Sequence, residues 1–281
     1  MTKRSHSLHE KKVMRVALIG CGAIGTYVAK GLRARMPDKY ELTGVLDTPK
    51  PEAAEKLADE MGCKACRDLQ AILRLKPDIV VEAANREAVW AFGEKCLKKG
   101  ANLVILSSGA LLDNEFRKRL IDLAGKMKRK VYVPSGALGG LDIARAASVA
   151  GAAHASLVTR KPPATLEGAP YLRGRGLRDL RETEKLFDGS VVEGVSGFPQ
   201  NVNVAASLSL AMGSTDLVRL AIIADPSLSS NVHRVEFTGE FGRAFVEIQG
   251  RPMPDNPKTS ALAAMSILAL LKRIQDPLEI G

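Results

Sequence analysis

Cysteine is scarce in this sequence and stops early. The four cysteines lie at positions 21, 63, 66 and 96, and none follows Cys96, which excludes covalent catalysis by a cysteine in the second half. Cys63 and Cys66 have C-x-x-C spacing, but no second pair or nearby histidine completes a zinc site. The sequence also has no H-E-x-x-H motif and no G-x-S-x-G elbow. We therefore predict no bound metal and no serine hydrolase.

Long apolar runs and aromatic residues are also missing. No run approaches the roughly 20 apolar residues that span a bilayer, and no apolar signal segment follows the basic N-terminus. We expect residues 1–12 to be a disordered extension, and the protein to be cytoplasmic with no membrane partner. Lys and Arg outnumber Asp and Glu by 41 to 31, but they are scattered, and aromatic residues are only 4% of the chain. This pattern disfavours nucleic acid and favours small anionic ligands.

What the sequence does contain near its start is a dinucleotide fingerprint. An apolar run over residues 13–19 leads into a G-x-G-x-x-G turn and then into helical spacing, the order that this motif requires. The glycines would allow a tight turn, close approach of a pyrophosphate and close packing of the helix on the strand. Asp47 ends the next β-like run, about where an acidic residue holds the adenosine ribose. We predict cofactor contacts from Gly20, Gly22, Ala23, Ile24, Gly25 and Asp47, with NAD preferred and NADP possible because Lys50 follows.

The order of expected elements predicts two domains. Six strands alternate with helices over residues 13–134, which is typical of a Rossmann doubly wound parallel sheet. We place the dinucleotide-binding domain at 13–135 and an α+β catalytic domain with a mixed or antiparallel sheet at 136–256. A C-terminal helix at 257–281 is expected to pack back on the first domain. In detail, we expect a strand at Ser190–Val195 and a buried helix at Pro257–Ile274.

Two loops and a few ionisable residues are candidates for the chemistry. The loops at 107–110 and 135–140 follow strands, so both point toward a cofactor at the carboxyl edge of the sheet. A nicotinamide enzyme also needs a proton-transfer group, and histidine is the commonest. Of the four histidines, only His233 follows a polar loop at the start of an expected strand, which leaves catalytic and structural roles equally open. A lysine relay through Lys161 or Lys258 stays an alternative.

Several strings of the second half resemble the L-aspartate dehydrogenase family, and the similarity extends in collinear order over roughly residues 14–275. The strings are 135–142 (SGALGGLD), 198–206 (FPQNVNVAA), 224–226 (ADP), 231–233 (NVH), 239–242 (GEFG) and 256–260 (NPKTS). Most of them lie outside the cofactor fingerprint, so together they are far more specific than that motif.

The resemblance implies NAD(P)-dependent oxidative deamination of L-aspartate. The product would be iminoaspartate, which can feed NAD biosynthesis or hydrolyse to oxaloacetate and ammonia. The family's catalytic histidine falls on His233, and its nicotinamide contacts fall on Ala137 and Asn203, with Asn201 as a neighbouring choice. A dicarboxylate amino acid also needs cationic anchors, for which we consider Arg160, Lys161 and Lys258. An apolar-faced strand in the second domain would suit a homodimer.

Two other functions remain open at the level of sequence. One is a homoserine-dehydrogenase-like or dihydrodipicolinate-reductase-like oxidoreductase that uses a lysine. The other is a regulator that senses NAD without turnover, although a histidine and small polar loops beside the expected nicotinamide position argue against it.

Overall fold

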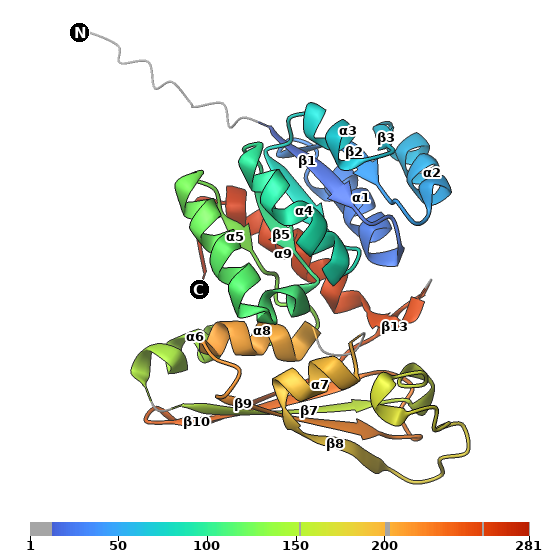
Figure 1. Ribbon diagram of the computed structural model, residues 1–281, viewed down its shortest axis with the longest axis vertical. Coiled ribbons are helices and arrows are strands. Elements are labelled where there is room, and N and C mark those ends of the chain that lie inside the picture. The colour runs from blue at the N-terminus through green and yellow to red at the C-terminus, as the bar shows by residue number, and fades with distance from the viewer. Residues whose placement is uncertain (1–12, 152, 200–202, 255, 281) are drawn as a thin grey trace, which may run out of the picture.

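The first half of the chain forms a parallel sheet covered by helices. The computed structural model describes residues 13–151, 153–199, 203–254 and 256–280, with the backbone alone at 150, 257 and 258 (Figure 1). The expected extension at 1–12 lies outside these residues. The elements of the first half are β1 (Met14–Ile19), α1 (Ala23–Arg35), β2 (Tyr40–Leu46), α2 (Pro51–Met61), β3 (Lys64–Cys66), α3 (Leu69–Arg74), β4 (Ile79–Glu82), α4 (Arg86–Lys98), β5 (Asn102–Ile105), the 3₁₀ turn η1 (Ser108–Leu112), α5 (Asn114–Lys126) and β6 (Val131–Tyr132).

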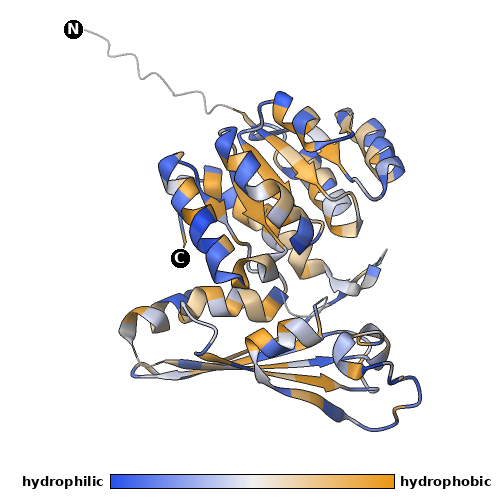
Figure 2. Ribbon diagram, viewed as in Figure 1, coloured by the Kyte–Doolittle hydropathy of each residue, from blue (hydrophilic) through white to orange (hydrophobic). Residues whose placement is uncertain are grey.

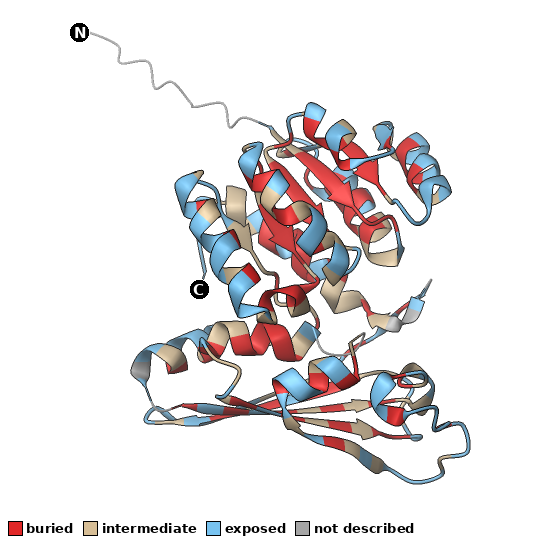
Figure 3. Cartoon of the chain, viewed as in Figure 1, coloured by how far each residue is buried: buried red, intermediate tan, exposed pale blue. Residues whose placement is uncertain are grey.

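The strand order of this sheet is β3-β2-β1-β4-β5-β6, and every pair is parallel. The chain reverses its direction of travel across the sheet between β1 and β4, which is where ligands of such sheets bind. The central strands are mainly apolar and are buried on both faces (Figures 2 and 3), as helices on both sides demand. The predicted Rossmann doubly wound sheet is confirmed.

The second half contains a five-stranded mixed sheet and three helices that lie on one of its faces (Figure 1). Its strand order is β11-β10-β7-β9-β8, with β7 and β9 parallel and the other pairs antiparallel. The helices α6, α7 and α8 lie between this sheet and the first domain (Figure 1). The elements are α6 (Leu141–Ala150), β7 (His154–Lys161), β8 (Glu184–Ser190), α7 (Val191–Gly197), α8 (Asn203–Met212), β9 (Val218–Ala224), β10 (Val232–Gly239) and β11 (Gly242–Gln249).

Two expected elements are wrong. The segment predicted as a strand from Ser190 is the helix α7, because Ser190 and Glu193 form a capping box. The Ser190 hydroxyl accepts from Glu193 N–H at 3.2 Å, and the Glu193 carboxylate accepts from Ser190 N–H at 3.1 Å. The last helix, α9 (Ala261–Gln275), begins four residues later than predicted. Residues 256–260 instead form β13 (Asn256–Ser260), which pairs with β12 (Pro252–Met253).

Helix α9 packs against the first domain. Gly31 of α1 lies so close to Leu268 that a Cβ there would come within 2.3 Å of a leucine methyl. The Tyr40 hydroxyl donates to the Leu271 carbonyl at 2.6 Å. No helix among the described residues is long and apolar enough to cross a membrane. The domain limits given above stay a prediction.

Candidate active site

The G-x-G-x-x-G turn has the geometry of a phosphate cradle. Gly20 has φ +99°, and a Cβ there would lie 2.6 Å from the Ala83 carbonyl oxygen. A Cβ on Gly25 would lie 1.9 Å from the Gly20 carbonyl oxygen, so only glycine lets α1 approach the turn. A Cβ on Gly22 would meet nothing within 4 Å, which leaves an open space above the main chain.

The N-terminus of α1 faces this open space without a cap of its own. Gly22 is the N-cap, no side-chain cap hydrogen bond is present in the described part of the chain, and the first turn holds no acidic residue. Free N–H groups and the positive end of the helix dipole favour phosphate at such a position. The residues present therefore fit the pyrophosphate of NAD(P).

Asp47 is fixed at the end of β2 by two main-chain donors. Its carboxylate accepts from Cys21 N–H at 2.9 Å and from Lys50 N–H at 3.1 Å. It lines a cavity of about 490 Å³, the adenosine-side cavity, together with Gly20, Gly22 and residues that follow β2 and β4. An acceptor at this place suits ribose hydroxyls.

A second cavity, of about 230 Å³, adjoins the first because Ala83 and Ala84 line both. We call it the reaction-side cavity. It contains four of the predicted site residues: Ile24, Ala137, Asn203 and His233, and also the candidate anchor Lys161. Its other lining residues are Ala83, Ala84, Leu106, Ser107, Gly136, Val204, Ser207, Asn231, Thr259, Ser260 and Ala263. Both domains and the segment before α9 thus contribute to one cavity.

His233 is buried at the start of β10. It is 3% exposed, and its Nδ1 lies 3.0 Å from the hydroxyl oxygen of Thr159 on β7. Burial, with a smaller contribution from the positive charge of Lys161, lowers the pKa of His233 to about 3. The imidazole is therefore neutral near pH 7, and one of its ring nitrogens keeps its lone pair.

Lys161 ends β7 on the same side of the sheet as His233. Thr159 pairs with His233 in the antiparallel register, and side chains two residues apart on a strand share a face. Lys161 is 4% exposed, and burial lowers its pKa to about 8. The site thus combines a neutral imidazole with an ammonium group that is mostly charged at neutral pH.

Ala137 lies in the 135–140 loop that was expected to face the cofactor, and Asn203 contacts the other such loop, 107–110. Asn203 begins α8, where its side-chain oxygen accepts from Gly109 N–H at 3.4 Å and its carbonyl accepts from the Ser108 hydroxyl at 2.9 Å. Ala137 lies in a turn whose Gly136 N–H donates to the Ser266 hydroxyl of α9 at 3.1 Å.

Some of the predicted site residues do not reach the two cavities. Arg160 points to the opposite face of β7 from Lys161 and pairs with the fully buried Asp225, its Nε donating at 3.1 Å. Hydrogen bonds from Ser227 and then Arg160 lower the pKa of Asp225 to about 2. Ala23 lines neither cavity. Asn201 lies outside the described residues, as does the side chain of Lys258, although its neighbours Thr259 and Ser260 line the reaction-side cavity.

Sequence reasoning missed Thr159 and Asn231. A signal for each was present, because Thr159 lies two residues before Lys161, and Asn231 two residues before His233, so each pair shares a strand face. It also missed Glu82, the last residue of β4.

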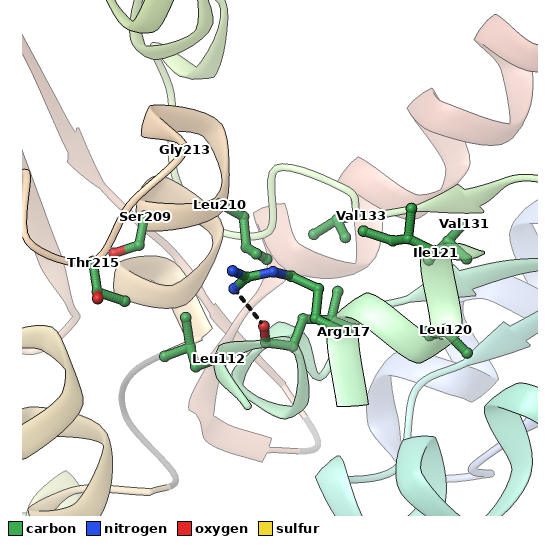
Figure 4. A pocket seen from close by; sticks show the side chains of 11 residues that line it. Leu112, Arg117, Leu120, Ile121, Val131, Val133, Ser209, Leu210, Gly213 and Thr215 are labelled. Atoms are coloured by element: carbon green, nitrogen blue, oxygen red, sulfur yellow. Dashed lines mark hydrogen bonds between the residues drawn. The ribbon is translucent and has the colours of Figure 1, made fainter. Parts of the chain in front are cut away.

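A third cavity, of about 290 Å³, lies where η1, α5 and β6 meet α8 (Figure 4). It is lined mainly by leucine, isoleucine and valine, and Arg117 is its one titratable side chain. The Arg117 guanidinium donates to the Leu111 carbonyl at 2.9 Å (Figure 4). Without a group that titrates near neutral pH, this cavity is no candidate for proton transfer. Among the described residues, no cluster of three His, Cys, Asp or Glu could hold a metal ion.

Comparisons with known proteins agree with this arrangement. A family model described as homoserine dehydrogenase, NAD binding domain, matches residues 20–134, and one described as aspartate dehydrogenase, C-terminal, matches residues 142–274. L-aspartate dehydrogenases of Methanosarcina mazei and Methanococcus maripaludis are 40% and 37% identical to this chain, over 96% of it and 100% of each relative.

Solved structures point the same way. The crystal structure of aspartate dehydrogenase from Thermotoga maritima matches with a TM-score of 0.75 at 27% identity, over 96% of this chain and 100% of that one. A dihydrodipicolinate reductase from Paenisporosarcina, at 16% identity and a TM-score of 0.55 over 94% of this chain and 95% of that one, shares the fold alone. The resemblance found in the sequence strings is confirmed, and the chain belongs to the L-aspartate dehydrogenase family.

Proposed function

We propose that this chain oxidises L-aspartate to iminoaspartate with NAD(P), and that the reaction takes place in the reaction-side cavity. The observation that carries the proposal is that a buried neutral histidine, His233, and a buried lysine, Lys161, line the same cavity. This cavity adjoins the adenosine-side cavity, which Gly20 and Gly22 line. The family relatives are L-aspartate dehydrogenases, which supports the choice of substrate.

The cofactor would be held mainly by main-chain groups. The open space above Gly22 and the uncapped start of α1 suit the pyrophosphate, and Asp47 suits the adenosine ribose. A carboxylate at this position repels a 2′-phosphate, so we expect NAD to be preferred over NADP. When bound, the cofactor accepts a hydride from the α-carbon of the substrate. Ala137 and Asn203 line the cavity where its ring would lie.

Lys161 is the cation best placed to hold a substrate carboxylate. It lines the cavity, whereas Arg160 lies on the other face of β7 and does not line it. An ammonium in a buried site attracts a carboxylate more strongly than in water, because the local dielectric is lower. Asn231, Thr259 and Ser260 supply further polar groups on the same wall.

His233 is the proposed general base. The substrate amino group arrives protonated, and it must lose a proton before the α-carbon can give up a hydride. When Nδ1 of His233 carries its proton and donates to Thr159, Nε2 keeps a lone pair for that proton. A substrate carboxylate bound at Lys161 would offset the positive charge that lowers the pKa of His233, and so make this lone pair more basic. The same group can later assist attack of water on the imine.

The proposal is tested by His233→Ala, with His154→Ala, an exposed histidine at the start of β7, as the matched control. We expect His233→Ala to lower kcat for L-aspartate about 100-fold or more, the usual contribution of a general base, while NAD affinity stays within about twofold. NADH absorbance and calorimetric titration with NAD measure the two quantities.

Two results would favour the rival functions. Near-normal turnover by His233→Ala together with loss of turnover in Lys161→Met or Lys258→Met would favour a lysine-dependent oxidoreductase. NAD binding by the wild type without turnover on a broad panel of amino acids, and none with oxaloacetate plus ammonia, would favour a sensor.

We also propose that the chain forms a homodimer through the face of the second sheet that the helices leave uncovered (Figure 1). Phe245 is 66% exposed on β11 and has the Arg234 guanidinium 5.4 Å from its ring centre. A cytoplasmic location stays a prediction, which cell fractionation tests.

A further inference from the structure

Glu82 is a charged residue at the centre of the parallel sheet. It ends β4, which lies between β1 and β5, and it is 2% exposed. Among the described residues it forms no ion pair. A buried carboxylate without a cation is costly unless hydrogen bonds satisfy it, so its contacts indicate what holds it there.

Three donors from two loops converge on this carboxylate. The Ser107 hydroxyl and the Ala84 N–H donate to Oε1, each at 2.8 Å, and the Ser107 N–H donates to Oε2 at 3.0 Å. Ala84 follows β4 and Ser107 follows β5. The Glu82 side chain therefore ties together the loops at the carboxyl ends of two adjacent strands.

These loops form part of the reaction-side cavity. Ala83 and Ala84 line it from the first loop, and Leu106 and Ser107 line it from the second. Glu82 itself does not line the cavity, so it affects the cavity only through the lining residues to which it hydrogen-bonds, Ala84 and Ser107.

The residue after Ser107 forms hydrogen bonds with the second domain. The adjacent Ser108, which is fully buried, donates to the Asn203 carbonyl at 2.9 Å and accepts from the Ser207 hydroxyl at 3.0 Å. Asn203 and Ser207 both belong to α8 and line the cavity. Two adjacent residues, Ser107 and Ser108, thus hydrogen-bond to Glu82 of the first sheet and to the helix that carries the proposed nicotinamide contact, respectively.

We propose that Glu82 is a positioning residue that fixes the nicotinamide side of the site by tying the loops after β4 and β5 to each other and, through Ser108, to α8. Burial raises the pKa of Glu82 to about 7, whereas its hydrogen bonds favour the carboxylate form, because all three partner groups of Ser107 and Ala84 donate. Glutamine keeps one acceptor oxygen but turns its amide N–H groups toward a donor. Alanine leaves both loops without their shared acceptor.

The test separates the nicotinamide side from the adenosine side. The variant is Glu82→Gln, with Glu115→Gln, an exposed residue of α5, as the matched control. ADP-ribose probes the adenosine and pyrophosphate contacts without a nicotinamide ring. The fluorescence of bound NADH reports how firmly the ring is held, and kcat for L-aspartate reports the reaction.

We expect Glu82→Gln to bind ADP-ribose within twofold of wild type, to lose at least half of the NADH fluorescence enhancement and to lower kcat at least tenfold. The single tryptophan supplies a further readout, since the Trp90 indole donates to the Ala110 carbonyl of η1 at 3.1 Å. Its quenching by acrylamide should increase in Glu82→Gln, because η1 directly follows Ser107.

Two results would overturn the inference: NADH fluorescence and Trp90 quenching unchanged from wild type, or ADP-ribose affinity lost together with them. If Glu82→Gln does not fold, Ser108→Ala replaces it. That variant removes only the link to α8 and should lower NADH fluorescence without changing ADP-ribose affinity. The inference rests on the proposed function only for kcat, so wild type that binds NADH but does not turn over aspartate would refute the function and leave the other readouts valid.

Discussion

At the scale of single residues, burial sets the charge of both His233 and Lys161. Both are buried where the end of β7 lies beside the start of β10, and removal from water disfavours the charged form of each group. The positive charge of Lys161 lowers the pKa of His233 further. Strand alternation distinguishes Lys161 from its neighbour, because it shares the inward row of β7 with Leu157 and Thr159 while Arg160 lies on the other face. The sequence alone had treated the two cations as equal candidates.

The pKa of Lys161 predicts the alkaline limb of the pH profile. Its value of about 8 means that the free enzyme loses the ammonium charge as the pH rises through 8, and with it the attraction for a substrate carboxylate. We expect kcat/KM for L-aspartate to fall above about pH 8. Lys161→Met should raise KM about tenfold or more at pH 7 and abolish this fall, since no proton is left to lose.

The control for this experiment is Lys185→Met, an exposed lysine of β8 that pairs with Asp188. Initial rates over pH 6–10 measure KM and kcat separately. An alkaline fall that persists in Lys161→Met would show that another group titrates there.

At the scale of elements, the turn before α1 makes different demands on its three glycines. Gly25 is required by the fold, because a Cβ would meet the Gly20 carbonyl, whereas Gly22 has an open surrounding and extended backbone that any residue adopts. The motif alone does not separate these roles.

Two substitutions test this difference. Gly22→Ala should change the free energy of unfolding by less than about 0.5 kcal/mol but weaken NAD binding at least tenfold, because its methyl group lies where the pyrophosphate would approach. Gly25→Ala should lower both the free energy of unfolding, by about 1–3 kcal/mol because of the clash with backbone, and the affinity for NAD. Urea unfolding and calorimetric titration measure these effects. Equal NAD affinity in Gly22→Ala and wild type would place the cofactor elsewhere.

In helix α7, the β propensity of the valines is outweighed by the capping box at the start of the helix. Val191, Val192 and Val195 have high β propensity, and they led to a predicted strand. The pattern Ser190-x-x-Glu193 is a capping box, and this local hydrogen bonding begins a helix at that point. The start of α9 was misplaced for a different reason. Residues 256–260 form a short hairpin with β12, and the helix begins only after Ser260, whose hydroxyl accepts from Leu262 N–H at 3.3 Å as its N-cap.

At the scale of the whole molecule, the chain returns to its first domain after building the second. Gly31 and Leu268 interlock α1 with α9, and Tyr40 donates to the carbonyl of Leu271. The segment between the two domains and the end of the chain therefore contribute to one site, since Ala137, Ser260 and Ala263 all line the reaction-side cavity.

The uncovered face of the second sheet predicts the oligomeric state. We expect light scattering after size exclusion to give the molar mass of two chains. Phe245→Asp should give the mass of one, because it places a charge in the proposed interface. Leu278→Asp, at a 71% exposed position near the C-terminus, should leave the dimer intact. A single-chain mass for the wild type would contradict the proposal.

The sequence by itself determined the Rossmann architecture, the cofactor class and the family, and it pointed to His233, to Asp47 and to a set of candidate cations that included Lys161. These conclusions depend on short-range patterns, namely strand, turn and helix order and strings of adjacent residues, which one chain displays in full. Tertiary structure alone decided that Lys161 rather than Arg160 enters the cavity, that Thr159 contacts His233, and that Glu82 ties two loops together. Each of these contacts joins residues of different strands or loops, so strand register and the packing of two domains had to be known before they could be seen.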